Sequence, residues 1–210
     1  MQLEHLKCRG EDRRKEIIQE YDIEIITYTC LLNGRIKESD AGDIITNEYY
    51  EFLCTSKMNS TQKIIVCGKH AGKSLIELAG LEPIKKFNPL VNINENGNGG
   101  GGHNGENEKK EKWNEISLEL YNAINILGLY WDVTLTGVLF NIKKDLEKYK
   151  SNKPFLKRII KVNKCISKDK NKLTISQMLN KLREYDENIR QYSFEKINQI
   201  LAENNIESYF

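Results

Sequence analysis

"KIIVCGKHAGKSLIELAG", residues 63–80, contains an apolar strand, a loop of small residues and a helix in immediate succession. The β-branched residues 64–66 favour a strand. Leu75, Ile76 and Ala79 recur at helical spacing after the loop. A loop that joins a strand to the start of a helix can hold a metal ion or a phosphate group. The elements on either side of this stretch indicate the fold class, and its loop indicates the chemistry.

The residues before this stretch predict a mixture of helices and strands. Residues 11–20 form a charged helical pattern. The β-branched and aromatic residues 21–32 predict a strand that ends at the turn Asn33-Gly34, which is typical of a hairpin. Residues 39–54 predict a capped helix, because their apolar residues recur at spacings of three and four.

The composition changes sharply at residues 92–112, where glycine, asparagine and charged residues replace almost all apolar ones. Such a segment cannot bury enough surface to offset its backbone entropy, so we expect a flexible linker. Residues 1–91 would then form one small mixed α/β lobe, and residues 113–210 a second lobe. His103 lies among the glycines of the linker, and we assign it no role.

The sequence of the second lobe predicts helices throughout its length. Apolar residues recur every three or four positions from Trp113 to Leu127, and the same spacing returns in later segments. Thr174 and Gln177 form a capping box at the start of one of these helices. Four or five such helices predict a bundle. The expected fold class is therefore α+β, with a small mixed α/β N-terminal lobe followed by a C-terminal helical bundle.

The overall composition excludes a membrane-spanning class. The chain has 32 Lys and Arg residues against 30 Asp and Glu, and no apolar run approaches the roughly 18 residues that a spanning helix needs. The first residues lack the basic-then-apolar layout of a secretory signal, so we expect a cytoplasmic protein. In that compartment the five cysteines are expected to be thiols or metal ligands rather than disulfides.

The loop first suggests a zinc site. Cys67 and His70 are three residues apart at the turn from strand to helix, a spacing at which a thiolate and an imidazole can bind one ion. Cys30 and Cys54 end two preceding elements and would complete a set of four ligands. We therefore expect zinc as a cofactor held by Cys30, Cys54, Cys67 and His70. Metal binding would then contribute directly to the folding of the first lobe.

Two other interpretations of these residues stay open. His5 and Cys8 have the same spacing and form an alternative second pair. Buried thiols that act as small apolar side chains would explain the cysteines without a metal. The order of hairpin, strand, knuckle and helix resembles a treble-clef zinc finger in outline, although the close first ligand pair of that family is missing.

A phosphate loop is the second chemistry that this stretch suggests. Residues 67–74, CGKHAGKS, match the pattern of a glycine, four free residues and Gly-Lys-Ser at three of four fixed positions, with Cys67 in place of the first glycine. Lys73 would offset phosphate charge. A nucleoside triphosphatase also needs an acidic residue at a strand end for magnesium, and Asp132 is the only approximation to it. A phosphate- or nucleotide-binding enzyme is therefore the third interpretation.

Positive charge concentrates in residues 143–172. This segment contains twelve Lys or Arg residues against three Asp or Glu, in a chain whose net charge is +2. Lysine at helical spacing indicates contact with phosphates rather than reading of bases. The residues expected to bind nucleic acid are Lys153, Lys157, Arg158, Lys161, Lys164 and Lys168. A solvated lysine-rich face is the alternative, and we expect the flanking Tyr149 and Phe155 to be core residues.

The leading interpretation is a non-enzymatic, zinc-stabilised protein that contacts nucleic acid through a lysine-rich helical face. Only three histidines are present, and paired carboxylates are expected on exposed faces, so no catalytic residue is assigned. The alternative is a protein-interaction or inhibitor module whose basic face docks an acidic protein partner.

Overall fold

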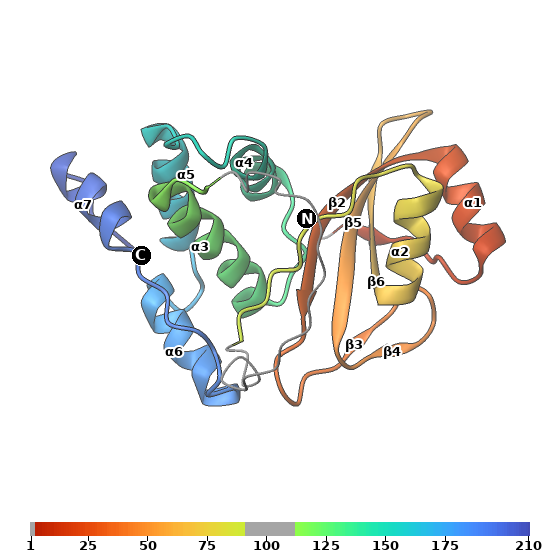
Figure 1. Ribbon diagram of the computed structural model, residues 1–210, viewed down its shortest axis with the longest axis horizontal. Helices are drawn as coiled ribbons and strands as arrows, with labels where there is room; N and C mark the ends of the chain where they lie inside the picture. The colour runs from red at the N-terminus through yellow and green to blue at the C-terminus, as the bar shows by residue number, and fades with distance from the viewer. Residues whose placement is uncertain (1–2, 91–111) are drawn as a thin grey trace, which may run out of the picture. The chain divides into compact units, whose positions relative to one another are not determined.

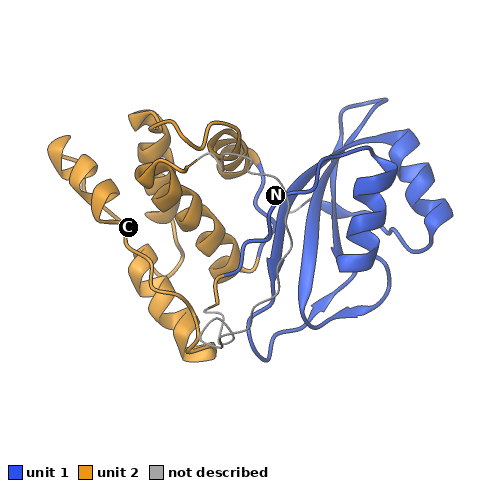
Figure 2. Ribbon diagram, viewed as in Figure 1, with its two compact units in different colours: residues 1–88, 133–136 blue, residues 89–132, 137–210 orange. Residues whose placement is uncertain are grey.

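A computed structural model describes residues 3–90 and 112–210 of the chain. The chain forms two compact units, residues 1–88 with 133–136 and residues 89–132 with 137–210 (Figure 2). In the described residues, the first unit contains a mixed β-sheet with helices and the second contains five helices. The predicted linker lies outside the described residues except for Lys112. No helix within the described ranges is both long and apolar enough to cross a membrane.

Four strands form the main sheet of the first unit (Figure 1). In order across the sheet they are β1 (Glu4–His5), β6 (Gln62–Gly68), β5 (Glu48–Ser56) and β2 (Tyr21–Cys30). β1 runs parallel to β6, and the other neighbours are antiparallel. Two helices, α1 (Glu11–Glu20) and α2 (Lys69–Leu78), lie on the same face of this sheet (Figure 1). A separate small sheet pairs β3 (Lys37–Glu38) with β4 (Ile44–Ile45).

The face of the sheet beneath the helices carries a core of the first unit. Alternate strand residues point to this face. The buried set includes Tyr50, Phe52, Cys54, Ile65 and Cys67. Gly72 of α2 faces this core, and a Cβ atom at this position would lie only 2.3 Å from Cδ2 of Tyr50. The second glycine of the predicted phosphate loop therefore has a packing role, because it lets α2 approach the sheet closely.

The helix predicted over residues 39–54 is wrong, because this segment forms β4 and most of β5. β5 lies between β6 and β2, and its residues are buried on both faces. Tyr49 and Leu53 are each 5% exposed, and Tyr50 is 2% exposed. A strand buried on both faces shows no alternation of apolar and polar residues, so its apolar run imitates helical spacing.

The hairpin predicted at Asn33-Gly34 is also wrong. A turn is present, with Gly34 at a positive φ of 74°. However, β2 does not pair with the strand that follows this turn. It pairs antiparallel with β5, so that Cys30 lies opposite Glu48. The intervening residues form the separate β3–β4 sheet before the chain returns as β5.

The helices of the second unit are α3 (Glu115–Trp131), α4 (Gly137–Lys148), α5 (Leu156–Ile166), α6 (Ile175–Tyr185) and α7 (Glu195–Glu203). α3 is the central helix because it packs against each of the other four. Its side chains Leu120, Ile124 and Leu127 are fully buried. The predicted capping box is confirmed at the start of α6, where Thr174 and Gln177 exchange side-chain and backbone hydrogen bonds.

A residue of α3 caps the start of α7. The N-cap residue of α7, Phe194, offers no side-chain acceptor. Glu119 supplies one: its Oε2 accepts the backbone N–H of Ile197 at 3.0 Å, and its Oε1 accepts that of Lys196 at 3.4 Å. Burial raises the pKa of Glu119, although these two N–H groups act in the opposite direction. The carboxylate therefore ties the last helix of the chain to the central one.

Candidate nucleic-acid interface

Helix α5 presents lysines on one side and apolar residues on the other. Lys157, Lys161 and Lys164 recur at spacings of four and three, and all are exposed. The opposite side is fully buried through Ile159 and Val162. One lysine just before the helix and one just after it are exposed as well. We call this set the α5 lysine face, and it consists of Lys153, Lys157, Lys161, Lys164 and Lys168.

The α5 lysine face has no carboxylate partner within residues 3–90 and 112–210. None of its five ammonium groups forms an ion pair with an Asp or Glu of that part of the chain. Like charges one helical turn apart repel each other by about 0.2–0.5 kcal/mol per pair. The face therefore carries uncompensated positive charge that an anionic partner would stabilise.

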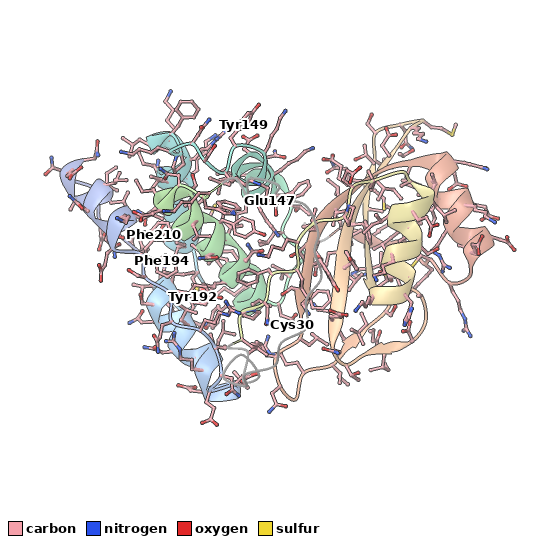
Figure 3. All side chains as sticks on the ribbon, in the orientation of Figure 1. Cys30, Glu147, Tyr149, Tyr192, Phe194 and Phe210 are labelled. Atoms are coloured by element: carbon pink, nitrogen blue, oxygen red, sulfur yellow. The ribbon has the colours of Figure 1, made fainter. Side chains whose placement is uncertain are left out.

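The three acidic residues in the surrounding segment are engaged elsewhere. Asp145 forms an ion pair with Arg158. Asp169 accepts the indole N–H of Trp131 at 2.8 Å and backbone N–H groups of the following turn. Burial raises the pKa of Asp169, but these donors outweigh burial and lower it overall. Glu147, on α4 (Figure 3), is partly buried and lies beside Tyr121 and Lys143.

Two basic residues of the segment differ from the lysine face because they are largely buried. Lys143 is 2% exposed, and its Nζ lies 5.7 Å from the ring centroid of Tyr121. Burial raises the pKa of the neighbouring Glu147, and the charge of Lys143 opposes that effect. The side chain of Arg158 is 24% exposed and its guanidinium is bound to Asp145. Arg158 was predicted to contact nucleic acid, but its charge is already partnered.

A cavity of about 380 Å³ opens beside the start of α5. We call it the α4–α5 pocket, and its lining includes Leu146, Tyr149, Asn152, Lys153, Phe155 and Arg158. Tyr149 follows α4 directly (Figure 3). It is 47% exposed, and Phe155 is 73% exposed. The prediction that these two aromatic residues belong to the core is therefore wrong. Phe155 is the N-cap of α5, so the apolar spacing of the helix does not extend to it.

Cys67 and His70, the close pair of the predicted zinc site, point into different environments. The side chain of Cys67 is fully buried between the sheet and the helices. His70 lies on the first turn of α2 and is exposed. The backbone changes from strand to helix between them, which rotates the imidazole away from the thiol. The predicted ligand cage at this turn is therefore not formed.

The other two predicted zinc ligands are not brought to Cys67 either. Cys54 lies opposite Lys63, four residues along β6 from Cys67, which corresponds to about 13 Å. Cys30 donates its S–H to the side-chain oxygen of Asn88 at 3.3 Å. In residues 3–90 and 112–210 no group of three or more His, Cys, Asp or Glu residues could hold a metal ion.

The alternative pair, His5 and Cys8, also points apart. Residues three apart on an extended chain face opposite sides, so His5 is exposed whereas Cys8 is fully buried. Cys8, Cys54 and Cys67 all belong to the core of the first unit. Burial raises the pKa of Cys54 to about 12, and a hydrogen bond with Cys8 together with burial raises that of Cys67. The three thiols therefore pack as small apolar side chains in this core.

An acidic side chain lies close to the start of α2 without capping it, and its charge disfavours the predicted phosphate loop. An oxygen of Asp43 lies 3.7 Å from the position that a Cβ would take on Gly68, the N-cap residue of α2. Ser74 would have to bind magnesium in a phosphate loop. Its hydroxyl instead accepts a hydrogen bond from Arg14 Nε at 2.9 Å.

The first lysine of the loop is engaged as well. Lys69 Nζ lies 2.6 Å from Oε1 of Glu48. Oε2 of the same carboxylate accepts from Lys86 Nζ at 3.1 Å and from the Tyr28 hydroxyl at 2.8 Å. Burial acts to raise the pKa of Glu48, but these three donors outweigh it and lower the pKa to about 2. The cluster fixes the start of α2 to the start of β5.

Asp40 forms a buried polar centre that the sequence patterns did not indicate. It is 2% exposed. Its carboxylate lies 2.9 Å from Nδ1 of His5 and 3.1 Å from Nζ of Lys7, and it accepts the backbone N–H of Val66 at 2.8 Å. Asp40 lies in the segment that was predicted to be helical. Its partners near β1 and on β6 therefore could not be inferred from the sequence. These bonds fasten the segment before β4 to the edge of the main sheet.

The fold and these surfaces define a two-unit α+β protein whose helical unit carries an uncompensated lysine face beside an aromatic pocket. Residues 6–210 match the family described as uncharacterised conserved protein UCP028583, and the chain belongs to that family. Comparison with curated proteins and with solved structures found no match. Function is therefore inferred from the residues of the chain itself.

Proposed function

We propose that the second unit binds nucleic acid through the α5 lysine face. The observation that carries this proposal is the presence of five exposed lysines without a carboxylate partner in the described residues. Nucleic acids offer closely spaced phosphates that suit such a row. Lys157 and Lys164 are two helical turns apart, about 10 Å, which is the axial distance covered by about three phosphates of one strand.

The use of lysine favours binding that does not depend on base sequence. The lysine ammonium is a flexible point charge, whereas bidentate reading of guanine commonly uses arginine. Residues 143–172 contain one arginine, and its guanidinium is held by Asp145. We therefore expect the α5 lysine face to bind the phosphate backbone, with an affinity that falls as salt is added.

An acidic protein surface is the competing partner, because charge complementarity alone would accommodate it. The aromatic residues next to the lysines favour nucleic acid. Phosphate contact and stacking on aromatic rings occur together in proteins that bind nucleic-acid strands. Tyr149 and Phe155 supply the rings at one end of the lysine face.

Charge reversal in the full chain tests the proposal. The variant Lys157→Glu, Lys161→Glu, Lys164→Glu is compared with Lys73→Glu, Lys85→Glu, Lys181→Glu, which makes the same change in net charge at exposed lysines elsewhere. Fluorescence anisotropy with labelled oligonucleotides at low salt should show a loss of about tenfold or more in the first variant only. Circular dichroism checks that both variants fold.

Two outcomes would contradict the proposal. An equal loss in the two variants would mean that net charge, and not this face, controls binding. Absence of nucleic-acid binding by the wild-type chain at low salt would leave the acidic protein surface as the better candidate.

A further inference from the structure

We infer that the α4–α5 pocket binds one unstacked nucleobase, so that the ligand is a single-stranded nucleic acid. This inference rests on the proposed function and adds to it the class of nucleic acid and the residues that hold the base. The pocket belongs wholly to the second unit, since its lining comes from α3, α4, the segment between α4 and α5, and α5 itself.

The size of the pocket suits a small planar ligand. Its volume of about 380 Å³ lies near the lower end of the range for small-molecule sites. Leu146 and Pro154 contribute apolar wall, while Tyr149 and Phe155 stand at the opening with much of their surface in solvent. Such a cavity accommodates one base but not a stacked base pair.

Exposed apolar side chains gather at this opening. Phe155 is 73% exposed, Tyr149 is 47% exposed and the adjoining Leu156 is 36% exposed. Single exposed apolar residues are common on proteins, but a group of them around a cavity indicates a binding site. The group lies where the local charge is strongly positive, so an apolar ligand that also carries negative charge fits best.

Each of the two exposed rings has a cation beside it. The guanidinium carbon of Arg158 lies 5.4 Å from the ring centroid of Phe155, and Nζ of Lys148 lies 5.3 Å from that of Tyr149. The charge of Arg158 is already balanced by Asp145. Lys148 and Lys153 are therefore the cations beside the rings that a phosphate can reach. A nucleotide matches this combination, because its base has flat faces that stack on aromatic rings and its phosphate is an anion.

Polar groups in the lining favour an unpaired base. The side-chain amide of Asn152 offers both a donor and an acceptor, and the carboxylate of Asp145 is held in place by Arg158. A base can present its Watson–Crick edge to such groups only when it is not paired with another base. Duplex bases are stacked and paired, which excludes them from the pocket.

The pocket and the α5 lysine face are continuous. Lys153 lines the pocket and is also the first residue of the lysine face. A strand whose base enters the pocket can therefore place its phosphates along Lys157, Lys161 and Lys164. The same strand would use both surfaces at once.

The test compares Phe155→Ala and Tyr149→Ala with Tyr185→Ala, a control at a tyrosine that is 65% exposed on α6. Anisotropy is measured with a single-stranded oligonucleotide and with a duplex of the same length. We expect the pocket variants to lose about tenfold in single-strand affinity, to change duplex affinity by less than about twofold, and the control to change neither. A strand containing 2-aminopurine gives a second readout, since stacking quenches its fluorescence.

The inference is overturned if the pocket variants bind the single strand as the wild type does, or if they lose single strand and duplex equally. Matching far-ultraviolet circular dichroism and melting temperature show that each variant is folded.

The charge reversal of Lys157, Lys161 and Lys164 distinguishes the proposed base pocket from the proposed nucleic-acid binding. If reversal abolishes binding while the pocket variants bind normally, only the base pocket is wrong, and if neither change affects binding, the proposed function is wrong as well.

Discussion

Gly72 determines how closely helix α2 approaches the sheet. The ring that it faces, Tyr50, is stacked on Tyr28 with centroids 4.0 Å apart and an interplanar angle of 5°. Tyr50 also lies 5.8 Å from Phe52, centroid to centroid. The ring is therefore held on its other side and cannot move aside to admit a methyl group.

Gly72→Ala is expected to destabilise the first unit by about 1–3 kcal/mol through overpacking. Helix propensity alone would stabilise the same variant by about 1 kcal/mol, so the sign of the change separates the two effects. Urea denaturation measures it. The exposed neighbour provides the control, since Lys73→Ala should stay within about 0.5 kcal/mol of the wild type. A gain in stability for Gly72→Ala would contradict the packing role.

Glu48 makes the stability of the first unit depend on acid pH. Its pKa in the folded protein is about 2, below the ordinary value of 4.5. A carboxyl group with a lowered pKa contributes stability that is fully present above its unfolded-state pKa and is lost as the pH falls through the folded-state value. The difference between 4.5 and about 2 corresponds to about 3 kcal/mol.

Glu48→Gln should therefore be less stable than the wild type by up to about 3 kcal/mol at pH 7. The deficit should shrink as the pH falls from about 5 to about 2. Chemical denaturation at a series of pH values measures the difference. Glu77→Gln, at an exposed position on α2, serves as the control. A deficit that does not vary with pH would show that the ionised carboxylate is not the source.

At the scale of elements, the start of α7 depends on a side chain of α3. Removal of an N-cap acceptor costs about 1–2 kcal/mol, so Glu119→Ala should destabilise the second unit by that amount. Thermal unfolding followed by circular dichroism measures it. Glu115→Ala removes an exposed ion pair with Lys196 and should cost only about 0.5 kcal/mol. Equal costs for the two variants would argue against the capping role of Glu119.

Elements with one buried face could be predicted from their periodicity, whereas β5, buried on both faces, could not. β6 is also buried on both faces, but its β-branched residues 64–66 favoured a strand. α5 and α6 show apolar residues on one side only, and the capping box of α6 depends on residues three apart in sequence. β5 has no such periodicity, because strands flank it on both sides and both of its faces are buried. Its sequence therefore does not alternate between apolar and polar residues. The pairing of β2 with β5 is likewise a long-range choice that the local turn does not determine.

The candidate site was predictable in part for the same reason. The row Lys157, Lys161 and Lys164 follows from helical spacing and charge, both of which are local. The pocket could not be predicted, because it depends on where α5 begins relative to Phe155. The proximity of cysteines in sequence suggested a metal, whereas the pleat of the strands and the start of α2 separate their side chains from His70.

The net charge of the chain is only +2, but its positive and negative charges are distributed unevenly along the sequence. Twelve basic residues against three acidic ones leave an excess of nine positive charges in residues 143–172. Such a concentration speeds the association of an anionic partner and makes the rate sensitive to salt. The remainder of the chain, which is acidic on balance, should contribute little attraction.

The salt dependence of single-strand binding by the wild-type chain shows whether the α5 lysine face contacts phosphates. If the five lysines of the α5 lysine face contact phosphates, the logarithm of the association constant should fall linearly with the logarithm of salt concentration, with a slope of about −3.5. Affinity would then drop about a hundredfold between 50 and 200 mM salt. A slope near zero, or no binding at 50 mM salt, would contradict the claim that this face binds nucleic acid.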